Sequence, residues 1–419
     1  MRKLDSKLVY LTSTAFSSFI LSLVFAANQL YRVQTVGLDP LQLVLVGTAL
    51  EVTAFIFEIP TGVVADVYSR RLSVIIGSFL FGLGFLVEGL FPIFGVVLLA
   101  QVIWGLGWTF ISGAHDAWIT DEVGAENVGQ IFLRSSQVSQ IASVVGIPFF
   151  VWLANLNYQV PIIVGGILMI VLGLFQMVAM DEQGFSPTPK AERETWKAMW
   201  STTREGFRLT RLQPTLWAYI GIAIFIGLYS EGYDRLSEKH FIDNFVFPAL
   251  PWGGDPIVSW FALMRVGSLP LTLIATEIIR RRESALKNHK VVRLLQGIYG
   301  GMVLGLLVFA RTQNFYVAVL ATLLIETLRG TTNPVTTTWL NQFIDSKVRA
   351  TVLSMISQVD ADGQMAGGPV VGLIGNLRSI RAALTGSALL LAPVVPLFGR
   401  AHKLEIERQN HEQVNQSKD

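Results

Sequence analysis

A few charged side chains lie inside long apolar segments of this 419-residue chain, where ionisable groups are rare. They are Glu51, Arg265, Glu326, Arg329, Asp360 and Asp362. A charged side chain near the centre of a bilayer costs about 2.5–3.5 kcal/mol on insertion scales, so its presence indicates a function. A carboxylate in apolar surroundings can take up and release a proton when its access to water changes. We therefore predict proton coupling first at Glu326 and Asp360, and then at Asp362 and Glu51.

The spacing of these residues predicts on which face of a helix each side chain lies. Glu326 and Arg329 are three residues apart, so on a helix they share a face and can pair. Asp360 and Asp362 are two residues apart and face different ways. The alternative to proton coupling is static pairing between helices, for example of Arg265 with Asp360.

Membrane-spanning helices must position these charges. Hydrophobic residues make up 52% of the chain and charged residues only 15%, whereas about a quarter of a soluble domain is charged. A helix needs about 20 apolar residues to cross the bilayer core. About twelve runs reach this length: 8–32, 40–65, 71–91, 93–119, 127–154, 158–180, 214–240, 256–280, 291–311, 314–340, 349–376 and 380–399. Because these runs are too long and too continuously apolar for barrel strands, we predict an all-α integral membrane protein.

The composition also excludes several classes of function. The chain has no cysteine and its five histidines show no ligand spacing, so we predict no metal site. No GxxxxGK[ST] sequence is present, and we expect no cofactor and no ATP-driven transport. A net charge of +2 gives no indication of nucleic-acid binding.

The distribution of basic residues predicts the orientation. Most of the 32 Lys and Arg residues fall on one side of the membrane if the N-terminus is cytoplasmic. This bias predicts that both termini are cytoplasmic, in a multi-pass protein of the cell's inner (plasma) membrane.

The longest polar stretch, 181–213, divides the chain into 1–180 and 214–400, with a polar tail at 401–419. We predict a flexible linker that includes an amphipathic helix; this helix lies either on the membrane surface or in solvent as an ordinary connector. The halves resemble each other, since PTGVVADVYSRR (60–71) aligns with PLTLIATEIIRR (270–281). Two pseudo-symmetric bundles of six helices, with a site between them, are typical of a transporter.

The stretch EIPTGVVADVYSRRL, residues 58–72, concentrates charge between the second and third spans. Its residues 62–71 resemble the loop 2–3 signature of the major facilitator superfamily, roughly G-x-L-A-D-R-x-G-R-R. They depart from it at Val67 and Ser69, where the family has a basic residue and a glycine. Together with SGAHDAWITDEV (112–123), the stretch looks most like the bacterial drug-efflux branches. The resemblance implies twelve helices and alternating access in a functional monomer.

The resemblance further implies a latch at the cytoplasmic end, which is closed in one access state. The residues predicted for this gate are Gly62, Asp66, Arg70, Arg71, Asp121 and Arg134. Gly62 lets a neighbouring helix approach, and Asp66 pairs with an arginine or faces a helix N-terminus. We predict that Asp66, Asp121 and Arg134 share one charge network. Alternatively, Arg70 and Arg71 only fix the topology and Asp121 is a solvated loop residue.

In the family, helices 1, 4, 7 and 10 line the cavity. The substrate-site candidates are Phe25, Trp104, Trp108, Phe225 and Tyr229, with Arg265 and Arg329. The aromatic residues can instead face lipid or other helices. Glu231 and Arg235 are four residues apart and form either an outer gate or a surface ion pair.

Three functions are consistent with these features. The first is proton-coupled efflux of amphipathic drugs or metabolites, with lipid, protons and a small-molecule substrate as partners. The second is import of a polar or anionic nutrient, since Arg265 and Arg329 could hold a substrate anion. The third is a sensor or a membrane-embedded enzyme, for which no nucleophile with a base is evident, so we predict no enzyme. Gln101 stands where many proton-driven exporters carry an arginine, which argues against proton antiport.

Overall fold

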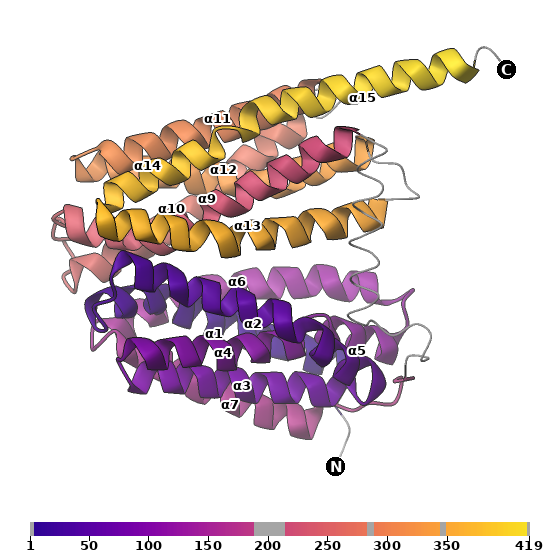
Figure 1. Cartoon of the computed structure of the whole chain (residues 1–419). Coiled ribbons are helices and arrows are strands. Elements are labelled where there is room, and N and C mark those ends of the chain that lie inside the picture. Colours follow the sequence, from indigo (N-terminus) through magenta and orange to yellow (C-terminus); the bar gives the residue numbers. More distant parts are fainter. Residues whose placement is uncertain (1–3, 188–213, 283–288, 344–348, 417–419) are drawn as a thin grey trace. The chain divides into compact units, whose positions relative to one another are not determined.

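The computed structural model describes residues 4–187, 214–282, 289–343 and 349–416, and within these residues it contains helices and no strands (Figure 1). The predicted amphipathic helix of the linker lies outside these residues. The chain forms two compact units. Unit 1 comprises Met1–Ala198 and Pro248–Ala262, and unit 2 comprises Met199–Phe247 and Leu263–Asp419.

Unit 1 contains the first six membrane spans. Its helices are α1 (Ser6–Gln34), α2 (Pro40–Val67), α3 (Arg70–Leu90), α4 (Phe94–Ile111), α5 (Ala114–Val123), α6 (Val128–Ala154) and α7 (Gln159–Ala179). Asp39 starts α2 with a capping box, and Pro40 occupies the first helical position, where its missing N–H costs nothing. Gly113, at φ 72°, separates α4 from α5 because this backbone conformation suits glycine.

Unit 2 contains the remaining spans. They are α9 (Pro214–Asn244), α10 (Pro256–Arg281), α11 (His289–Arg311), α12 (Phe315–Phe343), α13 (Arg349–Leu377), α14 (Ile380–Leu391) and α15 (Val394–Gln416). The start of α10, as far as Ala262, groups with unit 1. Pro393 lies between α14 and α15, and α15 extends beyond the other helices of its unit (Figure 1). Counted with α4–α5 and α14–α15 as single broken spans, the fold has the twelve predicted helices in two pseudo-symmetric bundles.

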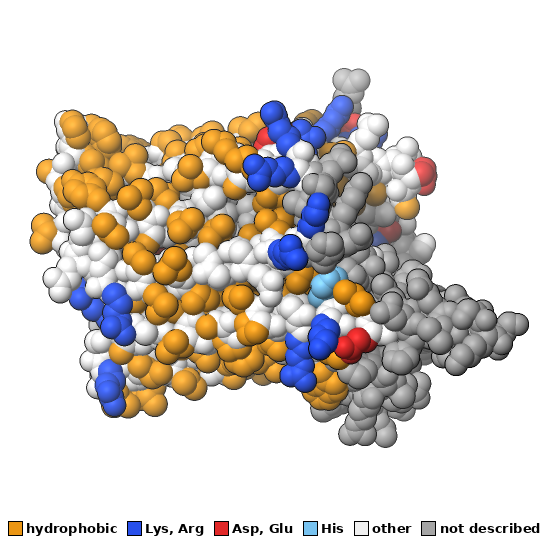
Figure 2. Space-filling model, turned by 90° about the horizontal axis from the view of Figure 1, so that it is seen from above, with side chains coloured by type: hydrophobic (Ala, Val, Ile, Leu, Met, Phe, Trp, Pro, Cys, Tyr) orange, Lys and Arg blue, Asp and Glu red, His pale blue; other side chains and the backbone are white. Residues whose placement is uncertain are grey.

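Ten of the described spans are apolar enough to cross a membrane by composition alone. The two that fall short are α9 and α13; α9 carries Glu231, Asp234 and Arg235, and α13 carries Asp360 and Asp362. On the face drawn in Figure 2, hydrophobic side chains cover the middle of the helices, whereas Lys and Arg gather toward the ends. This distribution is expected of a protein surrounded by lipid.

Equivalent helices pack closely in each unit. The first and fifth spans of unit 1, α1 and α6, lie together, as do α9 and α13 in unit 2. Gly146 allows the α6 backbone to approach the carbonyl of Phe19, and Gly363 does the same for α13 at Ile224 of α9. These matching contacts agree with the internal repeat seen in the sequence.

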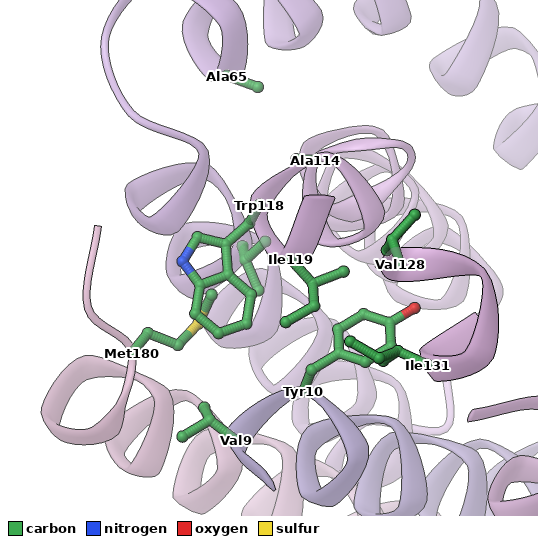
Figure 3. Packing of buried hydrophobic residues seen from close by; sticks show 10 residues of the cluster. Val9, Tyr10, Ala65, Ala114, Trp118, Ile119, Val128, Ile131 and Met180 are labelled. Carbon is green, nitrogen blue, oxygen red and sulfur yellow. The ribbon is translucent and has the colours of Figure 1, made fainter. Parts of the chain in front are cut away.

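A hydrophobic cluster holds one end of unit 1 together, around Trp118 of α5 (Figure 3). Tyr10, Ile119 and Ile131 pack together in this cluster, and Met180 brings in the end of α7. The Trp118 indole N–H donates to the carbonyl of Asp181 at 2.6 Å. The cluster thus fixes α5 and the first residue of the linker to the helices around them.

Candidate functional site

An ion pair in unit 2 joins α9 to α12. Arg329 donates two hydrogen bonds to the carboxylate of Asp234, at 2.5 and 2.9 Å. The guanidinium also lies over the ring of Tyr233, 5.5 Å from its centroid, where a cation–π contact is favourable. This fork-like pairing of a planar guanidinium with a carboxylate fixes both partners in orientation.

Glu326 is the second carboxylate of this cluster. Its Oε1 lies 3.9 Å from Nη1 of Arg329, so the pairing predicted from their spacing is present in the structure. Its side chain is 40% exposed. Asp234 is not among the site residues predicted from the sequence, although Glu231, Asp234 and Arg235 lie close together in α9, the seventh span, and this concentration of charge was a signal. Two carboxylates therefore share one arginine, and the cluster carries a net charge of −1 when both are ionised.

Arg265 does not pair with Asp360. It donates instead to Glu238 of α9, at 3.1 Å, so the proposed static pair of Arg265 with Asp360 is wrong. Asp360 accepts a hydrogen bond from Gln364, one turn along α13, at 2.9 Å. Asp362 is exposed, in agreement with the two aspartates facing different ways.

Glu231 and Arg235 form the predicted pair, with Nε of Arg235 3.0 Å from Glu231 Oε2. Glu231 is buried within unit 2, whereas Arg235 is partly exposed. Tyr229, two residues before Glu231, is buried at 2% exposure, and Phe225 is half-buried. Tyr229 is therefore closed off from solvent in this structure.

Aromatic rings gather between α1, α3 and α4 of unit 1. Phe25 lies 5.7 Å from Trp104 between ring centroids, and Phe81 lies 5.6 Å from Trp104 and 6.5 Å from Trp108. Trp104 is buried, whereas Phe25 and Trp108 are 38% and 49% exposed. Phe25 and Trp108 thus present aromatic surface, and behind it Trp104 packs against Phe25 and Phe81 packs against Trp108.

A buried polar cluster lies at the end of unit 1 where α3 ends. Arg32 donates to Glu88 at 2.7 Å and Gln101 donates to the other oxygen of Glu88 at 2.9 Å. Both side chains of the ion pair are almost completely buried. Gln101, noted in the sequence for replacing an arginine, therefore contacts a charge pair that the sequence analysis missed. Glu51, the other carboxylate predicted for this unit, is half-buried in α2.

Arg70 is the centre of the charge network at the opposite end of unit 1. It donates to Asp121 and, at 3.0 Å, to the carbonyl of Ala117. Asp66 lies 3.9 Å from Arg70, so Arg70 connects the two aspartates. Arg134 is exposed on α6 and makes no ion pair within the described residues, which corrects its predicted place in this network.

A different carboxylate occupies the N-terminus of α3. Glu182 accepts from the hydroxyl of Ser69 at 2.5 Å and from the backbone N–H of Arg71 at 2.9 Å. The sequence predicts that Asp66 either pairs with an arginine or faces a helix N-terminus. In the structure Asp66 lies near Arg70, and Glu182 occupies the N-terminus of α3. Among the described residues, no atom lies within 4 Å of where a Cβ at Gly62 would be, so no close helix contact is present there.

The start of the predicted flexible linker is tied to unit 1. Besides the contacts of Glu182, the backbone N–H groups of Gln183 and Gly184 donate to Glu122 at 2.7 and 2.8 Å. Arg71 reaches the carbonyl of Met177 at 2.7 Å. Residues 181–184 are therefore fixed by hydrogen bonds to α3 and α5.

The segment before α10 contacts the loop between α6 and α7. Asn155 accepts from the backbone N–H of Asp255 at 2.6 Å, and the hydroxyl of Tyr158 donates to the Asp255 side chain. Burial, and then the neighbouring Asp255 carboxylate, raise the pKa of Tyr158 well above its usual range. Tyr158 therefore remains a hydrogen-bond donor throughout the physiological pH range.

The whole-chain pattern identifies the family. Residues 10–368 match the sequence model of the Major Facilitator Superfamily. The chain belongs to this superfamily. The match covers the loop 2–3 signature, the first bundle and most of the second, and it confirms the resemblance found in the sequence.

Known relatives agree with this assignment. The MFS-type transporter YxaM of Bacillus subtilis is 24% identical over 365 residues, which cover 85% of this chain and 86% of YxaM. The fold is similar to that of the nucleoside transporter NupG, with a TM-score of 0.73 at 13% identity over 96% of this chain and 99% of NupG. It is also similar to that of a D-xylose-proton symporter, with a TM-score of 0.64 at 12% identity over 94% and 98% of the two chains. The protein is therefore a multi-pass membrane transporter of small molecules and not an enzyme.

Proposed function

We propose that this transporter exports amphipathic small molecules in exchange for protons. The observation that carries the proposal is the cluster of Asp234, Glu326 and Arg329, in which two carboxylates share one guanidinium. Arg329 is committed to Asp234 by two hydrogen bonds, so the negative charge of Glu326 is only partly compensated.

The surplus carboxylate provides a simple route to coupling. When Glu326 is ionised, the cluster is net negative and attracts a cationic substrate; when it binds a proton, the cluster is neutral and releases that substrate. Proton and cation thus compete for one carboxylate, and this competition gives exchange. We propose Asp360, held by Gln364, as a second proton-binding carboxylate, with Asp362 and Glu51 as further candidates.

The aromatic surface of unit 1 suits the apolar part of such a substrate. Phe25 and Trp108 expose their rings, and aromatic faces bind both apolar groups and organic cations. We propose that they bind the apolar part of the substrate together with Trp104 of unit 1. In unit 2, we propose that Phe225 contributes to substrate binding and that Glu231 and Arg235 form the outer gate.

The alternative, import of an anionic nutrient, has less support. Arg265 already binds Glu238, and Arg329 already binds Asp234. A substrate anion would have to displace a carboxylate from either arginine. The likeness to a nucleoside transporter and a sugar symporter concerns the fold alone at these identities.

The network around Arg70 suits the proposed latch. We propose that the protein is a monomer in the inner membrane of the cell and that both termini are cytoplasmic. This end of unit 1 then faces the cytosol. Asp66 pairs only loosely with Arg70, at 3.9 Å, whereas Asp121 holds Arg70 firmly. Asp66 is thus free to exchange partners as the access state changes, and Arg71 is bound to the end of α7.

Proteoliposomes with an imposed pH gradient test the proposal. Loss of gradient-driven flux of a hydrophobic cation is expected for Glu326→Gln, with a smaller loss for Asp360→Asn. Glu277→Gln is the matched control, because Glu277 pairs with Arg280 and Arg281 at the exposed end of α10. Full flux in both test variants would overturn the coupling assignment. Direction follows from cells that express the protein: export lowers their content of the cation, whereas import raises it.

A further inference from the structure

A polar cavity of about 310 Å³ lies within unit 1, close to the cluster around Trp118. Its walls come from α1, α5 and α6 and comprise Tyr10, Thr14, Ser17, Ser18, His115, Asp116, Ser135, Ser136 and Ser139. Its volume is at the lower end of the range found for ligand pockets, roughly 300–1,000 Å³. Six of the nine lining residues carry an aliphatic hydroxyl, and none is Leu, Ile, Val or Met. The cavity is therefore suited to a polar group rather than to an apolar one.

The lining carries a single negative charge and no lysine or arginine. One oxygen of Asp116 accepts from the hydroxyl of Tyr10 at 2.6 Å, and its other oxygen accepts no hydrogen bond from a described residue. Asp116 itself is exposed, so its carboxylate is open to the cavity mouth. One carboxylate oxygen is thus available to a ligand.

The other polar groups of the lining include hydroxyl oxygens, which can accept hydrogen bonds from a donor-rich ligand, and the ring of His115. Nε2 of His115 is buried without a hydrogen-bond partner in the described part of the chain. Its ring is held in place between Tyr10, at 4.5 Å, and Trp118, at 6.2 Å between centroids. Ser18 and Ser139 bond to each other at 2.7 Å, and each hydroxyl keeps lone pairs for a further donor.

We propose that this cavity binds the protonated amine of a small-molecule ligand. An ammonium group has three donors and no acceptor, and Asp116 compensates its charge. A neutral polyol would leave the carboxylate uncompensated, and an anion would be repelled by it. The site is distinct from the carboxylate cluster of unit 2. This proposal rests on the proposed function in one respect: the ligand is the exported cation, and the cavity binds its ammonium head group first.

The absence of cysteine from the chain allows a direct test. In the purified full-length protein, Ser17→Cys places one thiol in the cavity wall, and Ser357→Cys places one on an exposed part of α13 as control. Each is reacted with a cationic and an anionic methanethiosulfonate, and the rate ratio is normalised to the control. We expect the ratio of the cationic to the anionic rate at Ser17→Cys to exceed the ratio at the control by about fivefold or more. Even in water, a unit charge ~4 Å away changes a rate by about this factor. The selectivity should disappear in Ser17→Cys with Asp116→Asn.

Two comparisons separate charge from structure. Tyr10→Phe, combined with Ser17→Cys, removes the Tyr10 hydroxyl but keeps the Asp116 carboxylate, so the selectivity for the cationic reagent should persist. Tris should slow the reaction, whereas 1,1,1-tris(hydroxymethyl)ethane, which carries a methyl group in place of the ammonium, should not. A ratio equal to that of the control, or equal protection by both triols, would overturn the site. Because the assay reads binding without transport, a failure here leaves the gradient-driven flux of the Glu326 experiment unaffected, and the reverse also holds.

Discussion

Each unit contains ion pairs between helices, and two of these pairs differ in their exposure. Arg32 and Glu88 join α1 to α3 in unit 1, with side chains 3% and 0% exposed. Arg329 and Asp234 join α12 to α9 in unit 2, with side chains 27% and 39% exposed. Equivalent bundles of one fold thus hold one charge pair fully buried and the other partly exposed.

The difference separates a structural pair from one that can change state. A fully buried pair has no water to replace either partner, so loss of one charge leaves the other uncompensated. A partly exposed pair can break and re-form, because water solvates each partner in the open state. The Arg329 pair also has a third charged member, Glu326, with which it can exchange. We therefore propose that the Arg32 pair stabilises the fold and that the Arg329 pair takes part in transport.

The largest expected effect on stability is at Glu88. Replacing it in Glu88→Gln leaves Arg32 charged and buried, which should lower the free energy of unfolding by about 3–5 kcal/mol. Reversible unfolding in detergent micelles measures this change. The double variant Arg32→Met with Glu88→Leu should recover most of the loss, since it removes both charges. Equal instability of the single and double variants would show that the pair does not act through its charges.

A smaller effect on the free energy of unfolding is expected at Gly363, where α13 packs closely against α9. A Cβ at Gly363 would lie 2.7 Å from the carbonyl oxygen of Ile224, so Gly363→Ala should destabilise unit 2 by about 1–3 kcal/mol. Gly297→Ala is the control, because no described atom lies within 4 Å of its Cβ position and alanine favours a helix. The same unfolding assay compares them. Similar stability of the two variants would mean that α9 and α13 can separate freely.

Replacing Asp234 should have the smallest effect on stability of the three sites. Its effect on transport flux should be large. Because the pair is partly exposed, Asp234→Asn should change the free energy of unfolding by only about 0–1 kcal/mol. Gradient-driven flux should fall at least about tenfold, which corresponds to ~1.4 kcal/mol of barrier. Exchanging the charges, with Asp234→Arg and Arg329→Asp together, should restore part of the flux. A strong loss of stability with normal flux would reverse the roles given to the two pairs.

The sequence by itself determined the helical class, the twelve spans, the repeat and the family. These features are local: a bilayer requires runs of about 20 apolar residues, and the loop signature occupies ten positions. Pairs within one helix, such as Glu231 with Arg235 and Glu326 with Arg329, also followed from their spacing.

The tertiary structure alone decided the partners that belong to different helices. Arg329 pairs with Asp234, Arg265 with Glu238 and Arg32 with Glu88, and no periodicity relates these positions. Packing of the helices also excluded Arg134 from the Arg70 network and put Glu182 at the start of α3. The physical reason is that a charged side chain in a bundle pairs with whichever opposite charge the neighbouring helix brings to the same depth, and helix rotation and register are set by side-chain packing over the whole bundle.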